Sequence, residues 1–139
     1  MAYYIAINQI MSTKHVGDQG EAIAAKYLSK QGFTVIETNY RKKWGELDII
    51  AKQSGSVHFV EVKTHSYPTK AELLKRLSGD NYRPEELVHR FKLHQLERII
   101  QTWLAERKWE GEWQLDVVAV RIAEDDRYAT INHLQNVVV

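Results

Sequence analysis

The stretch that decides the fold is GELDIIAKQSGSVHFVEVK, residues 45–63. It contains two runs rich in Ile, Val and Phe, 46–52 and 57–63, separated by Gln-Ser-Gly-Ser at 53–56. Apolar, β-branched runs on either side of a short Ser-Gly segment predict two antiparallel strands joined as a hairpin with a four-residue loop. This hairpin also carries most of the chemistry that the sequence suggests.

The register of the predicted hairpin brings charged side chains together. With the loop at 53–56, Lys52 faces Val57, and the same register puts Asp48 opposite Glu61 and Glu46 opposite Lys63. Strict alternation then places the last four side chains on one face of the sheet. Two acids about 5 Å apart repel each other, so the pairing needs an explanation.

Two interpretations of this acid pair stay open. Asp48, Glu61 and Lys63 could form a salt-bridged patch on a solvated strand face, as many Glu-x-Lys tripeptides do. Alternatively, the apolar runs bury the acids, and a buried pair requires a bound proton or a cation. Carboxylate oxygens with backbone carbonyls and water suit Mg²⁺ or Mn²⁺.

The elements around the hairpin predict an α/β sandwich with a mixed sheet, in the order α, β, β, β, α, β. Residues 64–84 hold both prolines and are expected to form a long loop, within which 70–77 could make a short helix. The flanking elements are a helix capped by Ser12 or Thr13 and ending near Gln31, a strand at 33–39, a turn at 41–45, a helix opened by Pro84, and strands at 114–121 and 128–133.

Length and composition indicate one domain. The 139 residues suffice for a single core, and we expect it to span 12–139, with 1–11 as an N-terminal extension upstream of a second start at Met11. The absence of cysteine excludes disulfides, thiolate metal sites and a cysteine nucleophile. With no basic leader and no long apolar run, a cytoplasmic protein without membrane contact is expected.

The net charge of +1 conceals a basic middle, with fourteen basic and nine acidic residues between 40 and 108. Such a region suits a polyanionic partner, although a solvated surface of mixed charge explains it equally well. The run Arg41, Lys42 and Lys43 before Trp44 could grip a nucleic-acid backbone and stack on a base. An exposed basic turn with one packed Trp is the alternative.

Each of the two predicted helices carries one charged side chain near its apolar face. Glu21 lies at the margin of the apolar stripe of its helix, where it could join the acids or reach water, and Gly17 and Gly20 would let that helix approach the sheet closely. Lys92 aligns with the apolar face of the second helix, as a phosphate contact or as a lysine at the edge of the core.

In combination, these residues resemble the YraN family of endonuclease-like proteins, from about residue 15 to the C-terminus. That family is similar to archaeal Holliday-junction resolvases and to the PD-(D/E)xK nucleases, which have a restriction-endonuclease-like fold. His65 departs from the resemblance, because arginine is more common there. The motifs that carry it are Gly20-Glu21-x-x-Ala, Tyr27-Leu28, Gly32-Phe33, Asn39-Tyr40-Arg41, Gly45 to Ile50, Phe59 to Thr64, Lys92 and Leu115 to Val118.

The resemblance implies a metal-dependent endonuclease acting on DNA, plausibly branched or single-stranded, with Glu21, Asp48, Glu61 and Lys63 as its catalytic constellation. Asp48, Glu61 and the Val62 carbonyl would hold Mg²⁺ or Mn²⁺. From the residues themselves, Arg41, Lys42, Lys43 and Lys92 are candidates for phosphate contact, and Asp116 could support the site or simply end a strand. A homodimer is an open option, because resolving a four-way junction asks for two symmetric sites. The rival interpretation is a binding module that keeps the fold and holds nucleic acid or a protein without turnover.

Overall fold

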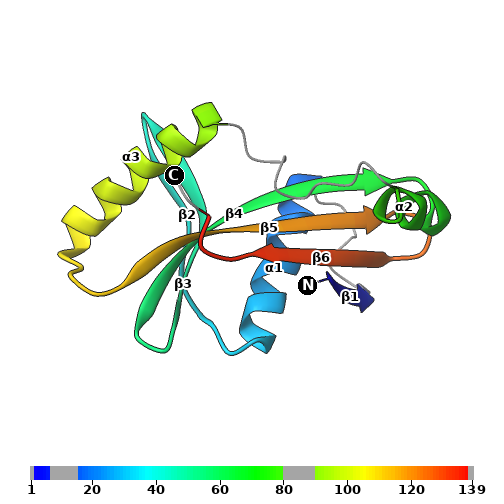
Figure 1. The fold of residues 1–139 in the computed structure, drawn as a ribbon, viewed down its shortest axis with the longest axis horizontal. Coiled ribbons are helices and arrows are strands. Elements are labelled where there is room, and N and C mark those ends of the chain that lie inside the picture. The colour runs from blue at the N-terminus through cyan, green and yellow to red at the C-terminus, as the bar shows by residue number, and fades with distance from the viewer. Residues whose placement is uncertain (1, 7–15, 80–89, 138–139) are drawn as a thin grey trace.

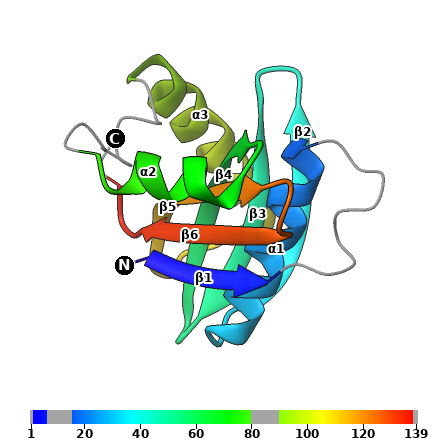
Figure 2. The ribbon, with the colours of Figure 1, turned by 90° about the vertical axis from the view of Figure 1, so that its right-hand side faces the viewer.

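The computed structural model describes residues 2–6, 16–79 and 90–137, which form a mixed sheet with helices on both faces (Figures 1 and 2). The six strands lie in the order β1-β6-β5-β4-β3-β2, and only β4 and β5 run parallel. The predicted α/β sandwich with a mixed sheet is therefore confirmed. Its elements are β1 (Ala2–Ala6), α1 (Val16–Lys30), β2 (Thr34–Lys42), β3 (Gly45–Gln53), β4 (Ser56–Tyr67), α2 (Lys70–Leu77), α3 (Arg90–Arg107), β5 (Trp113–Ala123) and β6 (Tyr128–Leu134).

The β3–β4 hairpin forms in the predicted register, with Lys52 paired to Val57. Its loop is shorter than expected, because Gln53 and Ser56 still pair and only Ser54 and Gly55 form the turn. Both turn residues have positive φ, 51° and 80°. This is the conformation of a two-residue turn whose twist matches that of the flanking strands.

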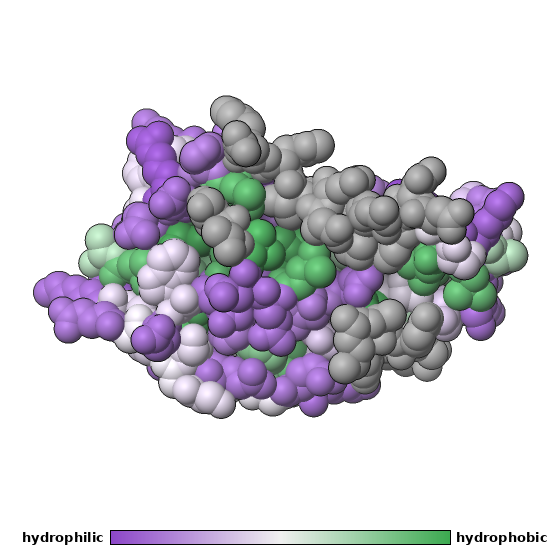
Figure 3. All heavy atoms as spheres, viewed as in Figure 1, coloured by the Kyte–Doolittle hydropathy of each residue, from purple (hydrophilic) through white to green (hydrophobic). Residues whose placement is uncertain are grey.

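Two hydrophobic clusters hold the helices to the sheet. Figures 1 and 2 show α1 on one face and α3 on the other. Hydrophilic side chains cover the end where α3 passes into β5, and hydrophobic ones emerge between α3 and the strands (Figure 3). The α1 cluster includes Ile23, Leu28, Ile49, Val60, Val62 and Val118, and the α3 cluster includes Leu47, Ile50, Phe59, Leu96, Ile99 and Trp103.

Gly20 explains how closely α1 approaches β4. A Cβ added at Gly20 would lie 1.8 Å from Thr64 Oγ1, so any side chain there would force the helix away from the strand. The prediction of close packing is confirmed for Gly20. It is wrong for Gly17, where an added Cβ would meet nothing within 4 Å. The residue after Gly20 is Glu21, whose position therefore depends on this contact.

Several element boundaries differ from those predicted. Residues 70–77 form helix α2, the short helix that the sequence allows within the expected long loop. Thr69 Oγ1 accepts a hydrogen bond from the Glu72 amide and caps it. Strand β4 continues to Tyr67, because it pairs with β5 along its whole length. Strand β2 includes Arg41 and Lys42, which were expected in a turn, because they pair with Glu46 and Gly45.

The N-terminal residues Ala2–Ala6, within the expected extension, form strand β1 at the sheet edge and pair with β6. The predicted caps at Ser12 or Thr13 and the helix start at Pro84 lie outside the described residues.

Candidate active site

The candidate site lies where β3 and β4 separate. Their paired residues end at Ile49 and Val60, one step before Asp48 and Glu61. There Asp48 Oδ2 accepts a hydrogen bond of 2.8 Å from the Val62 amide. The side chain thus satisfies a backbone N–H of β4 beyond the last paired residues of β3 and β4. Asp48 is thereby fixed beside β4 although it is buried.

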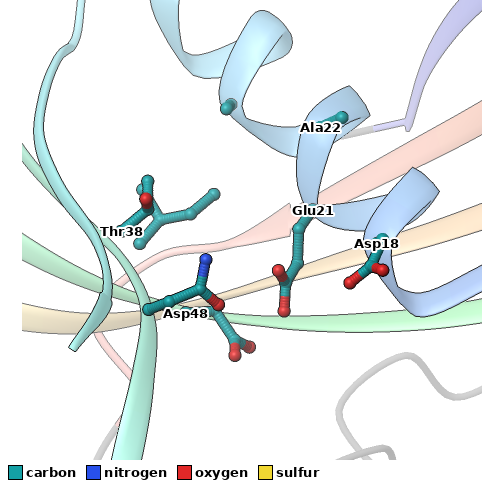
Figure 4. A pocket seen from close by; sticks show the side chains of 8 residues that line it. Asp18, Glu21, Ala22, Thr38 and Asp48 are labelled. Carbon is teal, nitrogen blue, oxygen red and sulfur yellow. The ribbon is translucent and has the colours of Figure 1, made fainter. Parts of the chain in front are cut away.

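An acidic cleft opens from Asp48 toward α1. Carboxylate oxygens of Glu21, Glu46 and Asp48 lie within 4.8 Å of one another, an arrangement that could hold a metal ion. The cleft has a volume of about 300 Å³, and Asp18 also lines it, one turn before Glu21. Figure 4 shows Glu21 and Asp18 extending from α1 toward Asp48.

Glu61 lies on the other side of Asp48 and faces α3. Its Oε1 is 3.9 Å from Lys63 Nζ, and its Oε2 is 3.9 Å from Lys92 Nζ of α3. The glutamate is only 5% exposed. Among the described residues, its Oε2 has no hydrogen-bond partner, which is unusual for a buried carboxylate oxygen.

The prediction that Asp48 and Glu61 share one face through regular alternation is wrong. Leu47 packs in the α3 cluster and Ile49 in the α1 cluster, so the strand loses its two-residue period at Asp48. Asp48 consequently lines the cleft beside α1, while Glu61 meets Lys92 of α3. The two acids still interact, because the negative charge of Asp48 acts on both Glu21 and Glu61.

Burial and mutual repulsion raise the pKa values of two of these acids. Burial, followed by the negative charge of Asp48, raises the pKa of Glu21 to about 7. The same two causes raise the pKa of Glu61 to about 8, although Lys92 and Lys63 act in the opposite direction. Near neutral pH the cluster therefore needs protons or a cation to balance its charge.

Two residues of the predicted phosphate-binding run, Arg41 and Lys42, form ion pairs within the molecule. Arg41 Nε pairs with Glu46 at 2.9 Å, and Lys42 Nζ pairs with Glu106 of α3 at 2.8 Å. Trp44 packs against α3, where its Nε1 donates to Thr102 Oγ1 at 3.1 Å and Arg98 lies over its ring. Lys43 is exposed. Trp44 is still 37% exposed, so a contact with a base stays a prediction. Lys63 and Lys92 are the lysines that the structure brings to Glu61.

Two acids of the cleft were not singled out from the sequence. Glu46 was placed on the acid face but assigned no role, and the register alone contained that signal. Asp18 precedes Glu21 by three residues, a spacing that aligns side chains on one helix face. Because surface acids at this spacing are common, it gave no reason to choose Asp18.

The hydrogen bonds of Asp116 go to residues other than the acids of the cluster, and Asp116 does not end a strand in solvent. It is fully buried, and its Oδ2 contacts His58 Nδ1 at 2.7 Å and His133 Nε2 at 2.8 Å. Its Oδ1 accepts from Gln114 Nε2 at 2.8 Å and from the Asn136 amide at 3.0 Å. Burial opposes ionisation, but these hydrogen bonds outweigh it and lower the pKa of Asp116 below its usual range. It is a saturated structural acid.

The fold and the site together define an α/β protein with an acidic cluster at the point where two central strands of a mixed sheet separate. The chain belongs to the uncharacterised protein family UPF0102, whose model matches residues 20–120. The resemblance to the YraN family is thereby confirmed. The match includes all four residues of the expected constellation.

Relatives agree with this assignment. The chain is 38% identical over 123 residues to a UPF0102 protein of Trichlorobacter lovleyi, covering 87% of each chain. It is 36% identical over 126 residues to a UPF0102 protein of Alkaliphilus oremlandii, covering 88% of this chain and 97% of the relative. Within the part of the chain that the structure describes, no helix is both long and apolar enough to cross a membrane.

Proposed function

We propose that this protein is a Mg²⁺- or Mn²⁺-dependent nuclease that hydrolyses phosphodiester bonds in DNA. The observation that carries the proposal is Glu61. Its carboxylate is buried beside Asp48, one oxygen lacks a hydrogen bond among the described residues, and an ammonium lies 3.9 Å from each oxygen. A purely structural acid would have its oxygens satisfied, as those of Asp116 are.

The donor atoms suit a hard divalent cation. Glu21, Glu46 and Asp48 offer carboxylate oxygens within 4.8 Å of one another, and Glu61 offers an oxygen with no other use. The N–H and C=O of one strand residue point to the same side. The Val62 carbonyl therefore faces Asp48, as its amide does, which supports it as a further ligand. A bound cation would neutralise phosphate charge and make water more acidic.

The two lysines complete the chemistry. In the proposed reaction, water attacks phosphorus and the bond to the leaving oxygen breaks. Lys63 Nζ holds the attacking water and donates a hydrogen bond to the phosphate as negative charge develops. Lys92 Nζ, on the other side of Glu61, contacts a neighbouring phosphate oxygen. Glu61 lies within 3.9 Å of both ammoniums, so it positions two positive charges for phosphate along this side of the site.

The test is cleavage of labelled linear, single-stranded, flapped and four-way-junction DNA with Mg²⁺ or Mn²⁺. We expect cleavage that Asp48→Ala and Lys63→Ala each reduce by at least about 100-fold, because each removes charge stabilisation at the reacting phosphate. Matched controls are Glu110→Ala and Lys30→Ala, which remove one negative and one positive charge at exposed positions outside the cluster. Gel filtration of the same samples distinguishes a monomer from the dimer that a junction substrate favours.

Two outcomes would contradict the proposal. Full activity in both site variants would point to a contaminant or to another site. Salt-sensitive DNA binding without cleavage of any substrate would favour the binding module, for which the acids have no catalytic use.

A further inference from the structure

Strand β4 carries Lys63 and His65 at and beyond the candidate active site, on the face away from α1. Thr64 faces α1, because its side chain fills the space that Gly20 leaves open. Its neighbours Lys63 and His65 therefore project to the opposite face, where Glu61 meets Lys92. Lys63 and His65 continue in line from the acid that the proposed reaction uses.

Two arginines add to this line. His65 pairs with Arg121 on the parallel strand β5, and Arg76 comes from the last turn of α2. Helix α2 packs against β4 and β5, which brings its last turn toward His65. Burial, followed by the positive charges of Arg121, Arg76 and Lys63, lowers the pKa of His65, in agreement with this placement. Arg121 is only 3% exposed, so its charge acts on a bound phosphate from beneath the surface without direct contact. His65 and Arg76 are exposed.

The positive line has a definite end. At the start of α2, Lys70 Nζ lies 3.8 Å from Asp126, and the Lys70 amide donates to Asp125. These acids belong to the turn between β5 and β6, so the charge becomes negative beyond α2. Lys63 and His65 are two strand residues apart, about 7 Å, which spans roughly two phosphates of a strand whose charges repeat every 3.4 Å of helix axis.

We propose that the phosphate backbone of a nucleic-acid strand, on one side of the cleaved bond, lies along β4 from Lys63 over His65 to Arg76. We call these three residues the β4 track. The inference rests on the proposed function for its starting point at Lys63. Its physical basis is the positive charge of Lys63 and Arg76, with the N–H of the His65 ring as a hydrogen-bond donor between them. Because phosphate is the group recognised, DNA and RNA strands both fit the track.

The test measures binding without turnover. Fluorescence anisotropy measures the affinity for short single-stranded DNA and RNA of equal sequence, at low salt and with a metal chelator. The affinities of the full chain and of three variants are compared. Arg76→Glu and His65→Glu should each weaken binding of both strands by about 10-fold, and Arg76→Glu should reduce the slope of log affinity against log salt by about 0.7. Lys30→Glu, an exposed charge reversal at the end of α1, should change affinity less than about 2-fold.

Thermal melting shows whether a charge reversal perturbs folding. A variant expected to bind more tightly keeps the test decisive in that case. His65→Arg adds a permanent charge and should tighten binding by several-fold. The β4 track is overturned if His65→Arg and Arg76→Glu both bind like the wild type, or if Lys30→Glu weakens binding equally. Cleavage in the presence of Mg²⁺ is scored separately. Loss of the track effect with cleavage intact refutes only the track, and a track effect without cleavage refutes only the nuclease.

Discussion

Asp116 and Glu61 are buried acids on neighbouring strands. The difference in their hydrogen bonds distinguishes an acid that stabilises the fold from one that is available for binding or catalysis. Asp116 pairs with Val60 in the sheet, so it lies one step from Glu61, yet the two side chains face opposite helices. Each oxygen of Asp116 accepts two hydrogen bonds, whereas one oxygen of Glu61 accepts none from the described residues.

This difference sets the direction in which burial acts. Hydrogen bonds lower the pKa of Asp116, because donors favour the ionised form. Burial and Asp48 raise the pKa of Glu61 to about 8, because few donors compensate for lost water. Asp116 thus stabilises the fold as it stands. Glu61 costs stability unless a proton or cation joins it, which is typical of a binding or catalytic group.

The largest effect should come from replacing each acid by alanine in metal-free buffer. Asp116→Ala leaves several buried donors without an acceptor and should lower the free energy of unfolding by about 3 kcal/mol. Glu61→Ala removes an unsatisfied acid and should change it by less than about 1 kcal/mol. Urea unfolding measures both, and equal losses in the two variants would contradict the contrast.

Gly20→Ala should have the next largest effect. The added methyl would lie 1.8 Å from Thr64 Oγ1, so α1 must move at its Glu21 end, at a cost of about 2 kcal/mol. Because this shift displaces Glu21 from Asp48, affinity for Mn²⁺ should fall together with stability. The matched comparison is Gly17→Ala, which meets nothing within 4 Å. A stable Gly20→Ala variant with unchanged Mn²⁺ affinity would rule out this positioning role.

The dependence of stability on pH should be smaller and should have opposite signs at the two acids. Glu61 and Glu21 bind protons more tightly in the folded state, so metal-free protein should lose roughly 1–2 kcal/mol as pH rises from about 5 to about 8. The lowered pKa of Asp116 acts in acid, where its contribution is lost as pH falls below about 4. Thermal melting across this range checks both signs, and Glu61→Gln should flatten only the upper part.

The residues that could be predicted from the sequence are those whose signal is local. The hairpin register follows from strand pattern and turn residues, and it correctly paired Lys52 with Val57. Gly20 was recognised because a glycine on the packed side of a helix favours close approach. Helix α2 has the bounds of the short helix that the sequence allows at 70–77. The pattern favours a long loop there, because turn residues surround the segment and a single Thr69 cap starts the helix.

What escaped prediction depends on tertiary structure. Alternation fails at Asp48 because the strands separate there, and a two-residue period contains no information on that bend. The Asp116 network joins His58, Asp116 and His133 from three strands, so no spacing in the sequence reveals it. The contact between Lys92 and Glu61 likewise requires α3 to be docked on the sheet.

The most direct test of the acid cluster is titration calorimetry with Mn²⁺ near pH 7 in buffers of different ionisation enthalpy, which counts the protons released on binding. With pKa values of about 7 for Glu21 and about 8 for Glu61, we predict that between about one and two protons are released per cation. Asp48→Asn should bind Mn²⁺ at least about 10-fold more weakly than Asp126→Asn. Binding without proton release, or equal affinity in the two variants, would contradict the account.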